Sequence, residues 1–435
     1  MDSTKSPSAG GAPVSDRSTE QPAHDWKRSL EPADRGEEYG GQTNPMGLLA
    51  VLGLFVLLYF WAGPRYFLVV VGIVVMIFLH ELGHFATAKW TGMKVTQFFM
   101  FMGPRLWSFR RGETEYGVRL LPVGAFVRIV GMNNLDPCPP EDEPRAYKNK
   151  SYPRRMLVIT AGSMMHFLQA LLLFGIVVSV IGLNDPSKWS VGLISQLENQ
   201  STPSVEAGLE PGDDIVAIDG IDTTDWGETV DYISARPGET VTLTIDRAGE
   251  VFDETVTLAS IPDEEGDGQR GFLGVGPSFD RTRESPVLAV ETFGETMWQA
   301  ITAIPRFLSP ATLGELGRLM FEGSGSVDIN SDEAERPVSL VGAVRIAGQD
   351  DFDVTVPLMM LGIFNVFIGV LNLLPLLPLD GGHAAIATYE RLRSRGDYRH
   401  QVDVAKLLPV AYAVIGLLGF IMISTVYLDI VRPIG

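Results

Sequence analysis

The chain has 435 residues, 46% of them hydrophobic, and a formal net charge of −19 at pH 7. This acidic balance excludes nucleic acid as a partner, because phosphate binding needs a basic surface that the chain lacks overall. The hydrophobic residues gather into long uncharged runs, which predicts an integral membrane protein surrounded by a lipid bilayer.

Five uncharged apolar runs follow a polar N-terminal segment. Residues 1–45 are rich in Ser, Pro, Gly and charged residues, which predicts a disordered tail. The apolar runs cover residues 46–63, 66–88, 156–183, 354–379 and 407–428, and each is close to the ~20 residues that a spanning helix needs. The first run is short, so it forms either an extra span or an interfacial helix. The expected fold class is a multi-pass α-helical membrane protein with four core transmembrane helices plus one extra N-terminal span.

The charges of the connecting segments predict how the helices are oriented in a cell membrane. Segment 89–155 has twice as many Lys and Arg as Asp and Glu, and segment 384–406 is also basic, whereas segment 184–353 is strongly acidic. Because loops rich in Lys and Arg stay in the cytoplasm, the two basic segments are expected to be cytoplasmic and the acidic segment external.

The second apolar run contains the sequence His80-Glu81-Leu82-Gly83-His84. Positions i and i+4 share a face of a helix, so His80 and His84 can both bind one Zn²⁺ ion while Glu81 lies beside them as a general base. A chance match is rare in a chain with only 6 His residues. Ionisable residues at membrane depth are costly, which favours a metal site over two structural histidines.

The fourth apolar run ends in a helix-breaking segment that leads to Asp380. Two prolines and two glycines, among them Pro375 and Gly381, interrupt the helix, and the freed backbone groups must be satisfied by the protein or by a bound peptide. We expect Asp380 to be the third zinc ligand, with a fourth position open for water. The alternative is a helix-end carboxylate at the membrane surface. Counting spans places both halves of the site toward the cytoplasmic leaflet.

Residues 46–183 are expected to form an N-terminal membrane region that contains a β segment. Residues 94–131 are β-prone, rich in glycine and too polar to span, which predicts hairpins against the cytoplasmic face of this region. Residues 286–353 are expected to be an amphipathic connecting segment, and residues 354–435 a C-terminal membrane region.

The acidic segment opens with a pattern typical of a small α+β domain. Residues 207–220 read Ala-Gly-Leu-Glu-Pro-Gly-Asp-Asp-Ile-Val-Ala-Ile-Asp-Gly, which resembles the signature of a PDZ domain. We therefore expect an inserted external PDZ domain over residues 184–285. Such domains bind peptides by strand addition, so Val191, Gly192 and Leu193 are the expected docking edge for a PDZ peptide ligand.

The two membrane motifs and the PDZ-like insertion together resemble the site-2 protease family of intramembrane zinc metalloproteases. The resemblance covers about residues 66–430. It implies His80, His84 and Asp380 as zinc ligands, Glu81 as catalytic base, and Asn372 as a residue that binds the substrate. The family also has a G-x-x-x-N/S/G pattern, and Gly162 to His166 keeps its glycine but departs from it at His166, which leaves packing or a polar contact as the role of His166.

The expected function is hydrolysis of a peptide bond in or near the transmembrane segment of a single-span membrane protein. The resemblance implies regulated intramembrane proteolysis, with anti-sigma factors or signal-peptide remnants as substrates. Two alternatives stay open: a membrane-anchored zinc protease of quality control that faces the cytoplasm, and a non-catalytic PDZ scaffold with a structural zinc.

Overall fold

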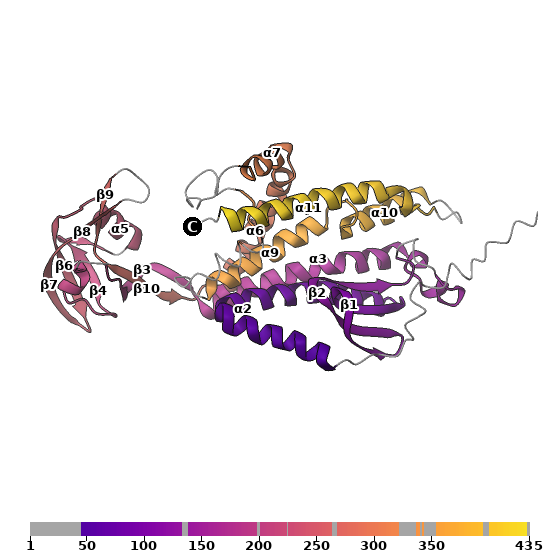
Figure 1. Ribbon diagram of the computed structural model, residues 1–435, viewed down its shortest axis with the longest axis horizontal. Coiled ribbons are helices and arrows are strands. Elements are labelled where there is room, and N and C mark those ends of the chain that lie inside the picture. Colours follow the sequence, from indigo (N-terminus) through magenta and orange to yellow (C-terminus); the bar gives the residue numbers. More distant parts are fainter. Residues whose placement is uncertain are drawn as a thin grey trace, which may run out of the picture.

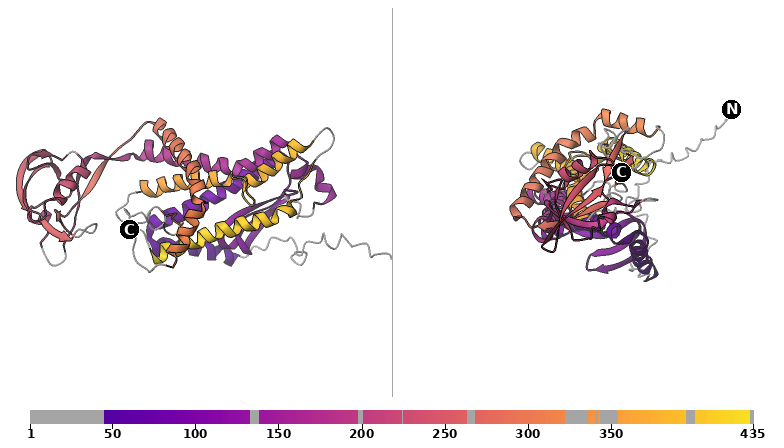
Figure 2. Two further views of the ribbon diagram at one scale, coloured as in Figure 1. Left: turned by 90° about the horizontal axis from the view of Figure 1, so that it is seen from above. Right: turned by 90° about the vertical axis from the view of Figure 1, so that its left-hand side faces the viewer.

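The computed structural model describes residues 45–132, 138–197, 201–223, 225–262, 268–321, 336–339, 342, 354–394 and 400–432. The predicted disordered tail lies outside these residues, apart from its last one. Figures 1 and 2 show an elongated molecule in which a bundle of helices is joined by a two-stranded ribbon to a small β-rich domain.

Four helices in the described part of the chain are long and apolar enough to cross a membrane. They are Tyr66–Trp90, the second part of α2 (Pro45–Trp90); α3 (Tyr152–Gly175), continued by the π-helix η3 (Ile176–Ile181); α9 (Thr355–Asn372); and α11 (Leu408–Val431), preceded by the short 3-10 helix η5 (Val404–Leu407). They overlap the four predicted core helices, so the chain has the expected multi-pass helical architecture.

The extra N-terminal span is not confirmed. Its residues form the first part of α2, and the apolar helix there, Leu49–Trp61, is shorter than a span. The chain reverses at Gly63, whose φ of 86° is readily adopted only by glycine. Phe55 and Tyr59 pack edge-on against Phe67 beyond the turn, so the two parts of α2 lie side by side (Figure 1).

The predicted β segment is a hairpin of β1 (Val95–Arg111) and β2 (Thr114–Ile129). Residues 97–100 pair both with 125–128 and with 115–118, so the long strands fold back on each other into a compact sheet. The 3-10 helices η1 (Pro140–Arg145) and η2 (Tyr147–Asn149) follow the sheet in the chain and lead to α3.

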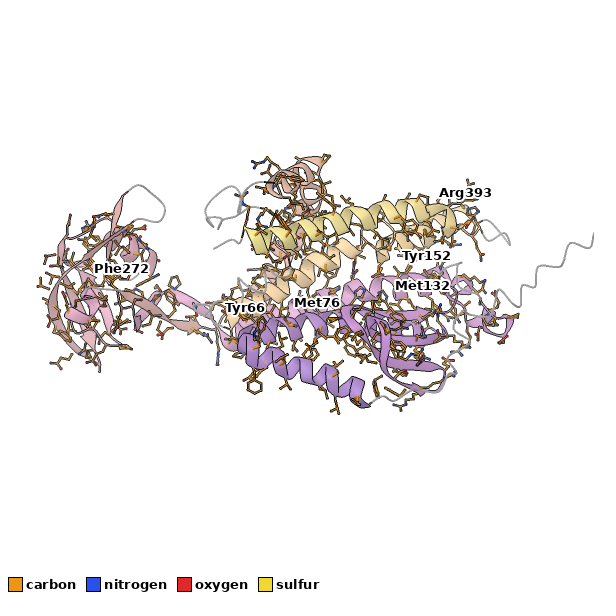
Figure 3. All side chains as sticks on the ribbon, in the orientation of Figure 1. Tyr66, Met76, Met132, Tyr152, Phe272 and Arg393 are labelled. Carbon is orange, nitrogen blue, oxygen red and sulfur yellow. The ribbon has the colours of Figure 1, made fainter. Side chains whose placement is uncertain are left out.

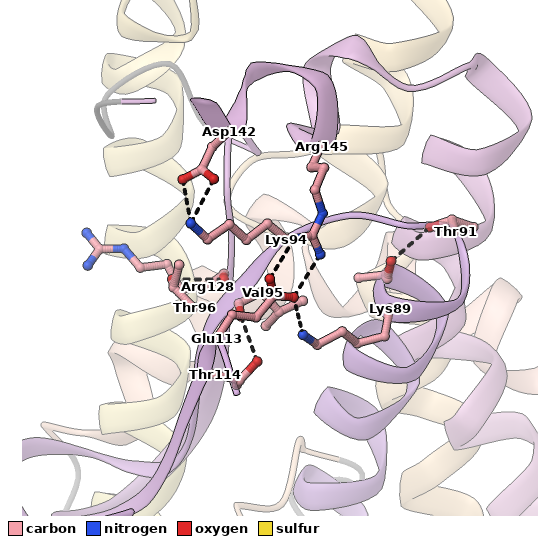
Figure 4. Close-up of polar contacts among 11 residues, drawn as sticks. Lys89, Thr91, Lys94, Val95, Thr96, Glu113, Thr114, Arg128, Asp142 and Arg145 are labelled. Atoms are coloured by element: carbon pink, nitrogen blue, oxygen red, sulfur yellow. Dashed lines mark hydrogen bonds and ion pairs between the residues drawn. The ribbon is translucent and has the colours of Figure 1, made fainter. Parts of the chain in front are cut away.

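Ion pairs fix the turn of this hairpin to the end of α2 (Figure 4). The Glu113 carboxylate accepts hydrogen bonds from Lys89 at 2.5 Å and from Arg145 at 2.6 and 2.8 Å. The Arg145 guanidinium, helped by Lys89, lowers the pKa of Glu113 to about 2. The hairpin is therefore held against the helix that carries the His80 and His84 pair.

The β-rich domain contains a four-stranded sheet of order β5-β4-β6-β7, a ribbon of β3 and β10, and a β8-β9 pair. Its buried core includes Ile218, Leu243 and Ile245. The elements in chain order are β3 (Leu183–Ile194), α4 (Pro203–Glu206), β4 (Asp214–Ile218), β5 (Ile221–Asp222), α5 (Trp226–Ser234), β6 (Thr240–Arg247), β7 (Glu250–Thr257), β8 (Ala259–Pro262), β9 (Gln269–Phe272) and β10 (Val275–Thr282).

The connecting segment forms α6 (Pro286–Phe307) and α7 (Pro310–Leu319), which return the chain to the bundle. Figure 2 shows α6 crossing the long helices, and Ala289 and Ala300 are buried with apolar residues of α3 and α9. Trp298 and Ile301 on the same helix are exposed. Such a distribution is typical of an amphipathic helix that packs on protein with one side and faces lipid with the other.

Candidate metal centre

Three predicted site residues meet in one place. His80 and His84 lie one turn apart on α2, and Asp380 is the first residue of α10 (Asp380–Arg393). Nε2 of His80 is 3.2 Å from Nε2 of His84, and Oδ2 of Asp380 lies 3.6 Å and 3.2 Å from these two nitrogens, respectively. Their side chains are only 7–16% exposed. Among the described residues, His80, His84 and Asp380 are the group of three or more His, Cys, Asp or Glu side chains close enough together to hold a metal ion.

The spacing of these three atoms fits a zinc ion. Tetrahedral Zn²⁺ lies about 2.0–2.2 Å from each nitrogen or oxygen ligand, which places neighbouring ligand atoms about 3.3–3.6 Å apart. Asp380 Oδ2 is buried and has no hydrogen-bond partner of normal geometry. Two imidazole nitrogens and a carboxylate oxygen facing one another in a buried site are costly without a cation between them. A zinc ion satisfies all three atoms.

The position of the His84 ring is fixed by its other nitrogen. Nδ1 of His84 lies 2.7 Å from the carbonyl oxygen of Val158 in α3. Since the carbonyl can only accept, Nδ1–H donates and Nε2 keeps its lone pair for a metal. Packing of α3 against α2 thus sets the tautomer of this residue.

Gly162 lets α3 approach both histidines closely. A Cβ atom at this position would meet Cε1 and Nδ1 of His80 and Nε2 of His84 at less than normal contact distance. The space beside the two rings is therefore kept open only because residue 162 has no side chain.

Two glycines place Asp380 at the start of α10. The chain turns after α9, and Leu376 and Leu379 make short-range backbone hydrogen bonds in the interrupted segment. A side chain at Gly381 would meet the carbonyl oxygens of Leu373 and Leu374, and one at Gly382 would meet the backbone of Leu376 and Leu377. The missing side chains allow the helix to begin against this turn, so that its first carboxylate reaches α2.

Glu81 lies beside the group on the same helix and is partly buried. Its carboxylate lies near the backbone of Val127 in β2. The hairpin therefore reaches the predicted base, although the two are 46 residues apart in the chain.

Sequence reasoning missed Asn365, which the structure places near the group. Nδ1 of His166 lies 3.0 Å from Oδ1 of Asn365, and the His166 ring stacks at a tilt on His80 with 4.8 Å between ring centroids. His166 therefore both packs against the site and makes a polar contact. The available signal was an uncompensated Asn inside the apolar run 354–379.

Asn372 and Pro375, both predicted to bind the substrate, lie in the segment that leads to Asp380. Asn372 ends α9, and Pro375 lies exposed in the turn that follows, so their roles stay predictions.

Strand addition at Val191, Gly192 and Leu193 stays a prediction, and in this structure the backbone of Val191 already has partners. Residues Val191–Leu193 pair on one edge with β10. On the other edge Val191 exchanges backbone hydrogen bonds with Gly212 and Asp213, both at 2.7 Å. A docking peptide would have to displace one of these neighbours.

The site combines a His80, His84 and Asp380 group with the adjacent Glu81, which is not part of that group, inside an apolar helix bundle. Comparison with known proteins shows that the chain is a zinc metalloprotease. It belongs to peptidase family M50, the site-2 protease family, whose sequence profile matches residues 66–416.

Relatives match most of the chain. Zinc metalloprotease Rip1 of Mycolicibacterium smegmatis is 33% identical over 399 residues, which cover 83% of this chain and 96% of the relative, and Rip1 of Mycobacterium tuberculosis is 32% identical over 404 residues with the same coverage. A putative zinc metalloprotease of Clostridium acetobutylicum is 29% identical over 362 residues, also covering 83% and 96%. The solved PDZ domain of an SdrC-like protein from Listeria monocytogenes matches 20% of this chain and 86% of its own at 25% identity, with a TM-score of 0.17.

Proposed function

We propose that the protein is an intramembrane endopeptidase that cuts single-span membrane proteins in or near their transmembrane segment. The observation that carries this proposal is that membrane-length helices supply or directly precede the three side chains of the metal group. Two ligands come from the membrane-length helix Tyr66–Trp90, and the third follows α9, another such helix, by a short turn. A peptide bond must therefore reach the apolar bundle to be cut.

The proposed roles follow from the geometry of the centre. His80, His84 and Asp380 would hold the zinc ion, which when bound makes water a nucleophile near neutral pH and polarises a carbonyl group. Glu81 accepts the proton of the attacking water and passes it to the leaving amine. The β2 backbone lies beside the Glu81 carboxylate at the site.

An extended substrate would pair with the β-hairpin. A transmembrane helix hides its peptide bonds in its own hydrogen bonds, so the substrate must unwind before it is cut. The β2 strand lies at Glu81 and offers backbone groups for strand addition. We place Asn372, Pro375 and Gly381 on the opposite side of the substrate backbone, where the interrupted helix frees polar groups.

The zinc site is proposed to face the cytoplasmic leaflet, with the β-rich domain as an external PDZ domain. In Figure 3, Tyr66 lies toward the end of the bundle that carries this domain, whereas Met132, Tyr152 and Arg393 lie at the other end. The basic segments 89–155 and 384–406 thus share one end, as the positive-inside rule requires. Labelling of single engineered cysteines in a Cys138→Ser background tests this, and external labelling at Ser151 would reverse the orientation.

The function is tested with purified enzyme and a single-span substrate in the same lipid vesicles. We expect cleavage within or beside the transmembrane segment, loss of cleavage in Glu81→Gln, and no cleavage of soluble unfolded protein. Mass spectrometry of the products locates the cut. Preferential degradation of soluble unfolded protein would instead support a quality-control protease, and cleavage by Glu81→Gln at the wild-type rate would reject the mechanism. Membrane fragments that accumulate in cells carrying Glu81→Gln would identify substrates of regulated intramembrane proteolysis.

A further inference from the structure

His166 and Asn365 connect three membrane helices at the metal centre. His166 is on α3, Asn365 on α9, and the ring that His166 contacts, His80, is on α2. His166 and Asn365 are only 2% and 1% exposed. Two polar side chains buried this deeply among apolar helices need a specific compensation, which each finds in the other.

The hydrogen bonds of Asn365 determine how His166 is held. Nδ2 of Asn365 donates to the Leu361 carbonyl at 2.8 Å, which leaves Oδ1 as an acceptor toward His166. Nδ1 of His166 must therefore carry its proton and donate it. The bond fixes both the tautomer and the rotation of the His166 ring, so this ring is a rigid surface against His80.

His80 lacks the support that His84 has. A metal-binding histidine usually donates its second N–H to an oxygen, as His84 does to Val158. Nδ1 of His80 is buried near the backbone of Gly162 but makes no hydrogen bond of normal geometry. The ring of His80 is instead held by contacts with the His166 ring, 4.8 Å away between centroids, and by close packing on Gly162.

We infer that His166, held by Asn365, is a positioning residue that orients His80 toward the zinc ion. The inference rests on the proposed role of His80 as a ligand. Contact with the His166 ring orients His80, whereas a hydrogen bond to the Val158 carbonyl orients His84. Loss of an outer contact of this kind typically weakens metal binding about 10- to 100-fold.

The test measures zinc affinity of the full-length protein by competition with a chromophoric chelator. We expect His166→Ala to weaken zinc binding about tenfold or more, and His166→Phe, which keeps a flat ring, to weaken it less. With Co²⁺ in place of zinc, the visible absorption of His166→Ala should shift, because the His80 nitrogen changes its direction at the metal. Activity lost by His166→Ala at limiting zinc should return at excess zinc.

The control variant is Gln169→Ala. Gln169 is buried on the same helix and donates to the Met165 carbonyl of its own helix at 3.1 Å, so its loss should leave zinc affinity unchanged. If His166→Ala does not fold, Asn365→Leu replaces it, with an expected loss of several-fold in zinc affinity. Wild-type zinc affinity and cobalt absorption in His166→Ala or Asn365→Leu would overturn the inference, as would equal losses in His166→Ala and His166→Phe.

A His80→Ala variant distinguishes the proposed role of His80 as a zinc ligand from the inferred role of His166 in positioning it. Retained zinc in His80→Ala would show that His80 is not a ligand and would reject the proposed site itself. Loss of zinc in His80→Ala, together with normal zinc binding in His166→Ala, would reject only the positioning role.

Discussion

Substitution of Gly162 by Ala should weaken zinc binding more than it lowers the stability of the metal-free protein. Alanine is a better helix former than glycine by about 1 kcal/mol, but the added Cβ overlaps two buried histidine rings, and such overpacking costs about 1–3 kcal/mol. The metal-free protein should therefore be at most about 2 kcal/mol less stable than wild type. The added Cβ would lie 2.7 Å from Nδ1 of His80 and closer still to Nε2 of His84. Cε1 of His80 would also lie closer than Nδ1. Since an ordinary contact is about 3.4 Å, the His80 ring must move by at least roughly 0.7 Å, whereas zinc–ligand distances tolerate about 0.2 Å. We expect zinc affinity to fall about 100-fold, or about 2.7 kcal/mol.

Gly175 supplies the matched control for this prediction. It is also on α3, and a Cβ there would meet no atom within 4 Å. Zinc affinity is measured by chelator competition, and stability by thermal unfolding of the metal-free protein in detergent. If Gly162→Ala binds zinc as tightly as Gly175→Ala does, α3 does not constrain the two histidines and our account of the site is wrong.

Three further predictions address the site and its support. Glu81→Gln should lower the cleavage rate by at least about 100-fold while zinc content stays at the wild-type level, because the base is lost and the ligands remain; a parallel loss of zinc would contradict this role. Asp380→Ala should lower zinc content and activity together, and unchanged zinc would place the third ligand elsewhere. The pKa of Glu113, lowered from 4.5 to about 2 by Arg145 and Lys89, means that its ion pairs stabilise the hairpin turn above pH 4.5 and are lost as the pH falls toward 2. Protection of residues 112–114 from hydrogen exchange, measured relative to an unstructured chain at the same pH, should fall over this pH range in wild type, whereas in Glu113→Gln it should already be low at pH 5; a wild-type profile in the variant would refute the anchor.

The sequence by itself determined the features that depend on local periodicity. His80 and His84 share a helix face because their spacing matches the helical repeat, and the apolar runs give the membrane-length helices. Alternating β-prone residues and glycines gave the β1–β2 hairpin. The interrupted segment before Asp380 also has a local cause, because proline lacks the backbone N–H of a helix and its ring clashes with the preceding turn.

The tertiary structure alone decided the contacts between distant segments. Asn365 and His166 are 199 residues apart, and no local pattern shows that they form a hydrogen bond. The closeness of Gly162 to both histidines depends on how α3 crosses α2, which follows from side-chain packing along the whole interface. The same reason applies at Val191: a strand pattern predicts a free edge as readily as a paired one. Only the folded domain shows that β3 pairs with β10 and that Val191 bonds to Gly212 and Asp213.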